Sequence, residues 1–242
     1  MFEALEITGS VSVGHNVTLR GCRIVGDPGA GSAGYTIKFT APGVTATLLD
    51  CEVICRTPTT KAVAVLNGCG LHMERTIVRG GEDGVFVRTT GTHIEGYSVV
   101  LRDCWLGVGQ RAPGTHSDII QIEQTNAGVL IERCRIEGYS LPEGGDPLTD
   151  DPDGSIYSSG GIILTQQSTQ PTVIDRVEIV DTYIVGGNWT VDTGPTDGLL
   201  PTNVLVSGCR FGRGHNIGAL RTGVGTTAVG NVWADDRTPI GG

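Results

Sequence analysis

The chain has few aromatic residues, few basic residues and no long apolar run. Aromatic residues make up 5% of its 242 residues, and 17 Lys and Arg face 26 Asp and Glu, for a formal net charge of −9. This acidic balance argues against a nucleic-acid partner, which needs a basic surface, and against binding to an anionic membrane surface. It does not exclude an acidic glycan, because a local cleft can be basic on an acidic protein.

Several familiar signals are also missing. No apolar run approaches the ~20 residues that a membrane-spanning helix needs. Residues 1–6 carry acids where a secretory signal has a positive segment, so we expect neither a signal peptide nor a transmembrane segment in this chain. No window of about a dozen residues has an apolar stripe at helical spacing. The sequence also lacks the Gly-x-Ser-x-Gly, phosphate-loop, Cys-x-x-Cys and nucleotide-binding motifs. Their absence argues against the enzyme classes that these motifs identify.

Glycine is abundant, at 38 residues, and the chain repeats one short phrase. Its clearest copy is Gly-Val-Leu-Ile-Glu-Arg-Cys-Arg-Ile-Glu-Gly at 128–138: an apolar run, a small pivot residue and a second run that ends in glycine. The pivot positions are Cys22, Cys51, Thr76, Cys104, Cys134, Thr182, Cys209 and Asn231. Self-similarity at intervals of roughly 20–50 residues is typical of a solenoid or array.

The repeated phrases alternate apolar and polar residues, which predicts strands, and Gly, Asn and Asp punctuate them as turns require. Two strands and their turns in each of about eight repeats predict an all-β fold. We expect one domain over 1–242, a parallel β-helix solenoid of about eight coils, with insertions at 139–159 and 187–202. Since stacked strands lie ~4.8 Å apart, each recurring position should form a column along the solenoid.

The cysteines are predicted to be buried free thiols. Five of the seven occupy pivot positions, where column side chains point the same way and not at each other. Cys55 and Cys69 lie off the column, and an odd count leaves at least one thiol unpaired. The chain also starts inside a strand-like run without a capping helix. An uncovered end of a β-helix is an open sheet edge, so we expect a partner subunit or a further domain to cover it.

A second strand column precedes the pivot phrases, for example at 84–89, 118–123 and 161–166. If Val85 and Ile120 face the core, alternate residues project outward and form a ladder on neighbouring coils. The outward set is then Phe86, Arg88, Gln121, Glu123 and Thr165. The insertion at 139–159 follows this coil directly, and long insertions on a scaffold often carry function.

The repeat phrase and the segment Gly-Thr-His-Ser-Asp-Ile-Ile-Gln at 114–121 resemble right-handed parallel β-helix proteins of the pectate-lyase-like superfamily. The segment is similar, more narrowly, to β-helix tail proteins of actinobacteria and their phages that carry a His-x-Asp-Gly-Ile-Gln phrase; Ile119 stands here at the Gly position. That superfamily includes polysaccharide lyases, glycoside hydrolases, epimerases and trimeric phage tailspikes. The resemblance therefore implies contact with carbohydrate by analogy of fold.

Three functions follow from this resemblance. The first is a tailspike-like tail protein, in a virion or outside the cell, that binds the surface polysaccharide of a bacterial host. The second is a lyase or glycoside hydrolase acting on that glycan, and the third is a structural virion component. The resemblance also implies a homotrimer or other tail subunits as partners, with no nucleic acid and no membrane insertion. Whether the protein is an enzyme stays open.

The candidate catalytic residues are His116, Asp118 and Glu123. Carboxylates on adjacent coils can reach the ~5–10 Å separation that glycosidases use. A lyase would instead need a base, His116 or Arg88, and a cation such as Ca²⁺ held by Asp118 and Glu123; we expect no other cofactor or metal. The candidate substrate-binding residues are Asp83, Arg88, Gln121, Thr165, Gln166 and Trp189. The alternative is that His116 and Asp118 are turn residues that bond to the neighbouring coil.

Overall fold

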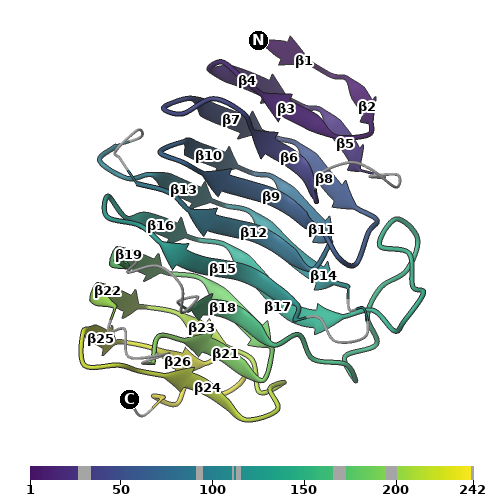
Figure 1. The fold of residues 1–242 in the computed structure, drawn as a ribbon. Coiled ribbons are helices and arrows are strands. Elements are labelled where there is room, and N and C mark those ends of the chain that lie inside the picture. The colour runs from purple at the N-terminus through teal and green to yellow at the C-terminus, as the bar shows by residue number, and fades with distance from the viewer. Residues whose placement is uncertain are drawn as a thin grey trace.

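The structure is a computed structural model that describes residues 1–26, 34–90, 95–110, 112, 116–165, 173–194 and 201–240. Three parallel sheets wind around one elongated core, with the strands stacked from the N-terminal to the C-terminal end (Figure 1). No helix in the described part of the chain is long and apolar enough to cross a membrane.

The three sheets are named A, B and C in the order in which the chain visits them. Sheet A contains β1 (Phe2–Glu3), β4 (Val17–Arg20), β7 (Thr45–Leu49), β10 (Gly70–Glu74), β13 (Val99–Arg102), β16 (Val129–Glu132), β19 (Asp175–Val180), β22 (Thr202–Ser207) and β25 (Thr226–Val229). Sheet B contains β2 (Glu6–Thr8), β5 (Arg23–Gly26), β8 (Glu52–Cys55), β11 (Ile77–Gly80), β14 (Trp105–Gly109), β17 (Arg135–Ser140), β20 (Tyr183–Gly186), β23 (Arg210–Phe211) and β26 (Val232–Trp233). Sheet C contains β3 (Val11–Val13), β6 (Tyr35–Phe39), β9 (Lys61–Leu66), β12 (Asp83–Arg88), β15 (Asp118–Gln124), β18 (Gly160–Leu164), β21 (Trp189–Asp192) and β24 (Gly218–Arg221).

The predicted fold class is confirmed: the protein is all-β, a parallel β-helix of eight complete coils followed by β25 and β26. The prediction of two strands per coil is wrong, because each coil has three. Each pivot phrase contains two strands joined by a corner, not the one strand that its alternating pattern predicts. In the clearest copy, β16 belongs to sheet A, Cys134 occupies the corner and β17 belongs to sheet B.

The corner owes its shape to the residue before each pivot. In all eight copies this residue has a positive φ, between 49° and 66°, and in five of them it is not glycine: Asp50, Arg75, Asp103, Arg133 and Asp181. A positive φ is uncommon for such residues, so the surrounding coils must hold it in place. The left-handed residue bends the chain from sheet A into sheet B and turns the pivot side chain inward.

The pivot side chains bond to the neighbouring coil, which explains why they are small and polarisable or polar. Thr182 Oγ1 accepts a hydrogen bond from the Cys134 amide at 3.2 Å, and Asn231 Oδ1 accepts one from the Cys209 amide at 3.0 Å. Cysteine pivots donate weakly instead, as Cys134 Sγ does to the Leu101 carbonyl at 3.5 Å. All seven cysteines lie among the described residues, and each is a buried free thiol, as predicted.

The core is built from apolar side chains that repeat in register. In sheet C, one such stack consists of Val63, Val85, Ile120, Ile162 and Val191, all fully buried. Burying a side chain of this size contributes about 1.5–3 kcal/mol relative to exposure. One continuous core cluster contains residues from Val13 to Ala219.

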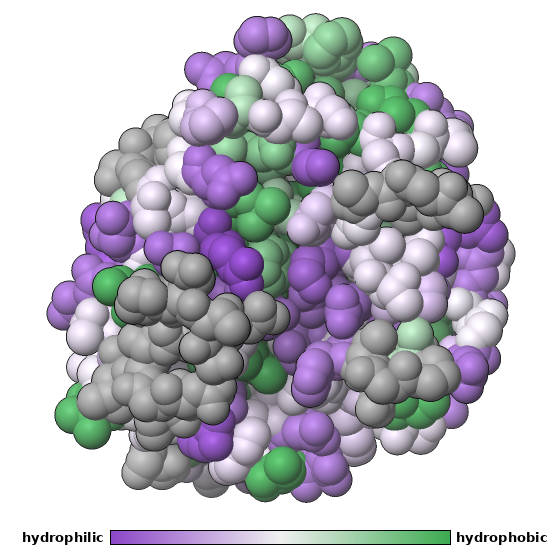
Figure 2. All heavy atoms as spheres, in the orientation of Figure 1, coloured by the Kyte–Doolittle hydropathy of each residue, from purple (hydrophilic) through white to green (hydrophobic). Residues whose placement is uncertain are grey.

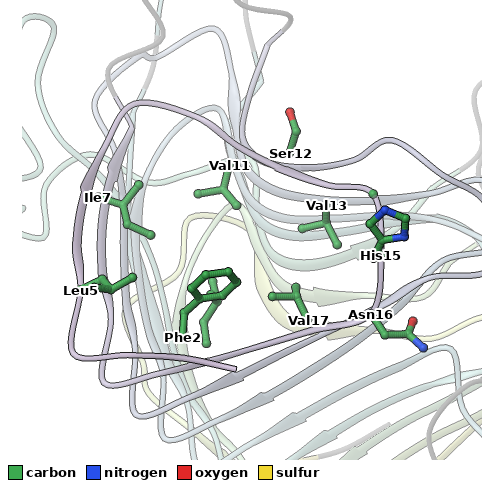
Figure 3. A pocket seen from close by; sticks show the side chains of 11 residues that line it. Phe2, Leu5, Ile7, Val11, Ser12, Val13, His15, Asn16 and Val17 are labelled. Atoms are coloured by element: carbon green, nitrogen blue, oxygen red, sulfur yellow. The ribbon is translucent and has the colours of Figure 1, made fainter.

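Apolar side chains of the first coil lie at the N-terminal end of the described core. Phe2, Leu5, Ile7 and Val11 point into an apolar hollow of about 420 Å³ at the mouth of the solenoid (Figure 3). Phe2 remains 54% exposed there. Large exposed apolar side chains at a sheet end mark a surface that favours contact with another chain.

Of the two predicted insertions, the first is a long connection between strands and the second contains a strand of the solenoid. Residues 141–159 connect β17 to β18 and extend back over earlier coils, where Asp146 pairs with Arg56 at 2.7 Å and Asp151 pairs with Arg79 at 2.6 Å. The proposed excursion at 187–202 is wrong in its first part, since Trp189–Asp192 is strand β21 of sheet C. Its residues 195–200 lie outside the described part of the chain.

Candidate functional site

Most of the predicted site residues lie on the outward face of sheet C, which we name the sheet C face. Two rows of register partners cross it. The first row is Lys61, Asp83, Asp118, Gly160, Trp189 and Gly218, and the second is Ala64, Phe86, Gln121, Ile163, Asp192 and Arg221. Strands of sheet C run down the middle of Figure 1, and Figure 2 shows hydrophilic side chains gathered in the middle of that same face.

Two buried carboxyl groups meet on adjacent coils at the start of this face. Asp83 and Asp118 are register partners, 0% and 4% exposed, and the Asp118 amide nitrogen lies 3.4 Å from Asp83 Oδ1. Lys61 Nζ lies 2.6 Å from Asp83 Oδ2 and 3.1 Å from Glu82 Oε2. Within the described residues, Asp118 Oδ1 has no hydrogen-bond partner.

Burial raises the pKa of both carboxyl groups. It raises the pKa of Asp83 to about 6, although Lys61 opposes the shift. Burial and the nearby Asp83 charge raise the pKa of Asp118 well above its usual range. For Lys61, burial favours the neutral amine, but Asp83 and Glu82 outweigh it and raise its pKa, so the amine stays charged. One lysine therefore serves as the counter-ion of two neighbouring buried carboxyl groups, and it pairs directly with Asp83.

The predicted catalytic residue Glu123 is held in a different way. It is 1% exposed and paired with Arg88, whose Nε lies 2.7 Å from Glu123 Oε2. Gln121 Nε2 donates to the other carboxylate oxygen at 2.9 Å. The strand pairing shifts register between Val87 and Arg88, which accommodates Glu123 as an extra residue in β15. With both oxygens engaged, this carboxylate fits a role in positioning Arg88 and Gln121.

The other predicted residues are not all brought together. His116 is exposed just before β15, and Thr165 follows β18 in a half-buried position. Trp189 shares the row of Asp118 but lies two coils further along, with its ring over Gly218. Gln166 lies outside the described residues. Sequence reasoning missed Lys61, although it opens β9 at the same position at which Asp83 opens β12.

The geometry gives no support to Ca²⁺ bound by Asp118 and Glu123. Arg88 and Gln121 already occupy the oxygens of Glu123, and the charged amine of Lys61 lies beside the Asp83–Asp118 pair. Across the described ranges, no group of three or more His, Cys, Asp and Glu residues is placed to hold a metal ion. A Ca²⁺ site normally offers six or more oxygen ligands, which this face does not provide.

Comparison of the chain with protein-family models, with curated proteins and with solved structures found no match. The class of this protein is therefore defined by its architecture, a parallel β-helix. Many functions occur on one fold, so the function of this protein depends on the side chains on the surface of the β-helix.

Proposed function

We propose that the protein binds a bacterial surface polysaccharide along the sheet C face, as a tail or tailspike-like component of a virion. The observation that carries the proposal is the outward ladder itself. Gln121, Arg88, Trp189 and Arg221 are all partly exposed on this face. They come from strands β12, β15, β21 and β24 of the same sheet, whose neighbouring strands lie ~4.8 Å apart. Polar groups that fix orientation, next to aromatic surface, are the usual elements of a ligand site.

Retention on immobilised glycan tests this proposal. Actinobacterial cell-wall polysaccharides are the first ligands to test, because the resemblance of the segment at 114–121 points to such hosts. Gln121→Ala and Trp189→Ala should each weaken retention several-fold, since they remove a hydrogen-bonding group and an aromatic surface. Thr227→Ala, at an exposed position on sheet A, is the control and should bind like the wild type. Unchanged retention in both sheet C variants would contradict the proposal.

Cleavage of the bound glycan is the second candidate, and the Asp83–Asp118 pair favours it. A carboxyl group kept protonated near neutral pH can act as general acid, and a neighbouring carboxylate can act as base or nucleophile. Cleavage requires the glycosidic oxygen to approach Asp118 Oδ1, the atom without a partner among the described residues. New reducing ends in wild type but not in Asp118→Asn would support hydrolysis. Ultraviolet-absorbing unsaturated products would indicate a lyase. Retention of the protein on the glycan without any product would indicate binding without cleavage.

A homotrimer or another assembly with tail subunits completes the proposal. It is supported by the apolar hollow of the first coil, which Phe2, Leu5 and Ile7 line and where Phe2 and Leu5 are exposed. Light scattering should give a mass above that of one chain, and Leu5→Glu should shift it toward the monomer by placing a charge in the contact. A wild-type protein that stays monomeric at high concentration would remove this part of the proposal.

A further inference from the structure

The outward face of sheet B carries a row of four register partners in successive coils: Trp105, Arg135, Tyr183 and Arg210. We name it the sheet B row. Each member directly follows a pivot residue, so the corner places all four at the same point of their coils. Neighbouring members are separated by the strand spacing, and the row therefore extends over roughly 14 Å. Aromatic and cationic side chains alternate along it.

The row borders two adjoining surface hollows that share Arg210. One, of about 460 Å³, is lined by all four members together with Asp103 and Arg133. The other, of about 600 Å³, is lined by Arg210, Arg237, Asp181 and neighbouring backbone. Arg133 and Arg135 in the first hollow are balanced by their ion pairs with Glu132 and Glu137. The second hollow is the locally positive one, because Arg210 and Arg237 line it with Asp181 as its one acidic residue, on a chain of net charge −9. A local basic cleft attracts anions even on an acidic protein.

Arg210 and Arg237 differ from the other arginines of the described residues. Twelve of those fourteen arginines form an ion pair, whereas Arg210 and Arg237 form none. Both are exposed, and both line the same hollow. An arginine that lacks an internal carboxylate keeps its planar fork of donors for an external anion.

We propose that the sheet B row and Arg237 form a second binding site, specific for a saccharide chain that carries carboxylate groups. Arg210 and Arg237 bind the carboxylates, and the rings of Trp105 and Tyr183 pack against the apolar faces of sugar units. Two features favour a chain over a small anion: the length of the row and the presence of aromatic surface beside the cations. This site is separate from the sheet C face and does not depend on the proposed function of that face.

Arg135 and Trp105 are already engaged within the protein. Arg135 pairs with Glu137 at 2.5 Å and lies over the Tyr183 ring at 5.5 Å. Trp105 Nε1 donates to Glu137 Oε2 at 3.0 Å, and the Arg79 guanidinium lies 5.5 Å from the Trp105 ring centre. These contacts hold the rings in place, so the row is ordered before a ligand arrives. Preorganisation of this kind lowers the entropic cost of binding.

Isothermal titration with hyaluronate oligosaccharides tests the site, with the same oligosaccharides methyl-esterified at their carboxyl groups as the matched ligand control. The wild type should bind the free acid, with affinity falling as salt rises, and should not bind the ester. Arg210→Gln and Arg237→Gln should each lower affinity about tenfold or more. Tyr183→Ala should weaken binding, while Tyr183→Phe should preserve it.

Arg20→Gln is the protein control, since it removes one positive charge from an exposed side chain in β4, far along the solenoid. It should leave affinity unchanged, as should Thr227→Ala on sheet A. Equal binding of the ester, wild-type affinity in both Arg210→Gln and Arg237→Gln, or an equal loss in Arg20→Gln would overturn the proposal. Loss in Gln121→Ala alone would assign the glycan to the sheet C face instead.

Discussion

The sheet C face and the sheet B row use similar residue types in opposite ways. On the sheet C face the buried carboxylates form ion pairs with cations of the same face: Asp83 pairs with Lys61, and Glu123 pairs with Arg88. On the sheet B row the cations are exposed, and Arg210 has no ion-pair partner among the described residues. Both surfaces follow from the same stacking of coils in register. Register alone therefore does not decide whether a polar ladder supports the fold or awaits a ligand; burial and charge balance do.

The largest effect is expected from breaking the buried charge pair. Lys61→Met leaves Asp83 buried without its counter-ion, which should cost about 3 kcal/mol or more of unfolding free energy. Thermal and urea denaturation measure this loss. Lys61→Met combined with Asp83→Asn should recover most of it, because the buried charge is then gone. Lys38→Met, a lysine of β6 without an ion pair among the described residues, should have little effect. A Lys61→Met protein as stable as wild type would show that the sheet C charges do not support the fold.

The pH dependence of stability gives the next effect. The folded-state pKa of Asp83 is about 6, above the ~3.9 of an unfolded chain. The folded protein therefore binds more protons at Asp83 between these values, and the contribution of Asp83 to stability should fall as pH rises from about 4 to about 6, then level off. Asp83 alone contributes up to about 3 kcal/mol to this fall. Melting temperatures across this range should fall less in Asp83→Asn than in wild type. Parallel pH profiles for the two proteins would rule out this role of Asp83.

The corner that presents the sheet B row should be sensitive to its pivots. Thr182→Val removes the hydroxyl that accepts the Cys134 amide and leaves that buried donor unsatisfied, at a cost of about 1–3 kcal/mol. Thr182→Ser keeps the hydroxyl and should cost less. Denaturation measures both, and the titration with hyaluronate should weaken in Thr182→Val if the corner also orders Tyr183. Equal stability of the valine and serine variants would contradict the hydrogen-bond account.

The smallest effect should distinguish paired from unpaired arginines within the sheet B row. Arg135→Gln removes a cation that Glu137 already neutralises, so hyaluronate affinity should fall less than about fivefold. Arg210→Gln, which removes an unpaired cation, should reduce it more. The same titration measures both variants. If Arg135→Gln is the more damaging substitution, the distinction between the two arginines is wrong.

The recurrence of small pivots was sufficient to predict the parallel β-helix, because a position that repeats in every coil must stack on itself. The corner was missed because Asp103 and Arg133 adopt positive φ without a glycine to signal it. A run containing such a residue looks like one continuous strand. The third strand of each coil therefore could not be predicted from the sequence and required the backbone dihedral angles of the structure.

Prediction of the site was similarly partial. Arg88 and Gln121 were placed on one face because alternation along a strand sets the side of each residue. Asp118 has the same parity as the core residue Ile120, and only the resemblance of the segment at 114–121 placed it at the start of that face. Lys61 was missed because coil lengths vary, and the pairing of residues across coils cannot be read from a fixed period. The sequence does mark the positions of the sheet B row, because each member directly follows a pivot. The burial and ion pairing of these residues depend on side chains that only the fold brings beside them, such as Glu137 of the next coil beside Trp105.

A crystal structure with a hyaluronate tetrasaccharide tests most directly whether the two faces divide their roles as described. The account predicts sugar rings beside Trp105 and Tyr183, with a carboxylate within hydrogen-bond distance of Arg210, while Lys61 remains paired with Asp83. A tetrasaccharide that leaves the sheet B row empty, with its carboxylates paired to Lys61 in place of Asp83, would contradict it.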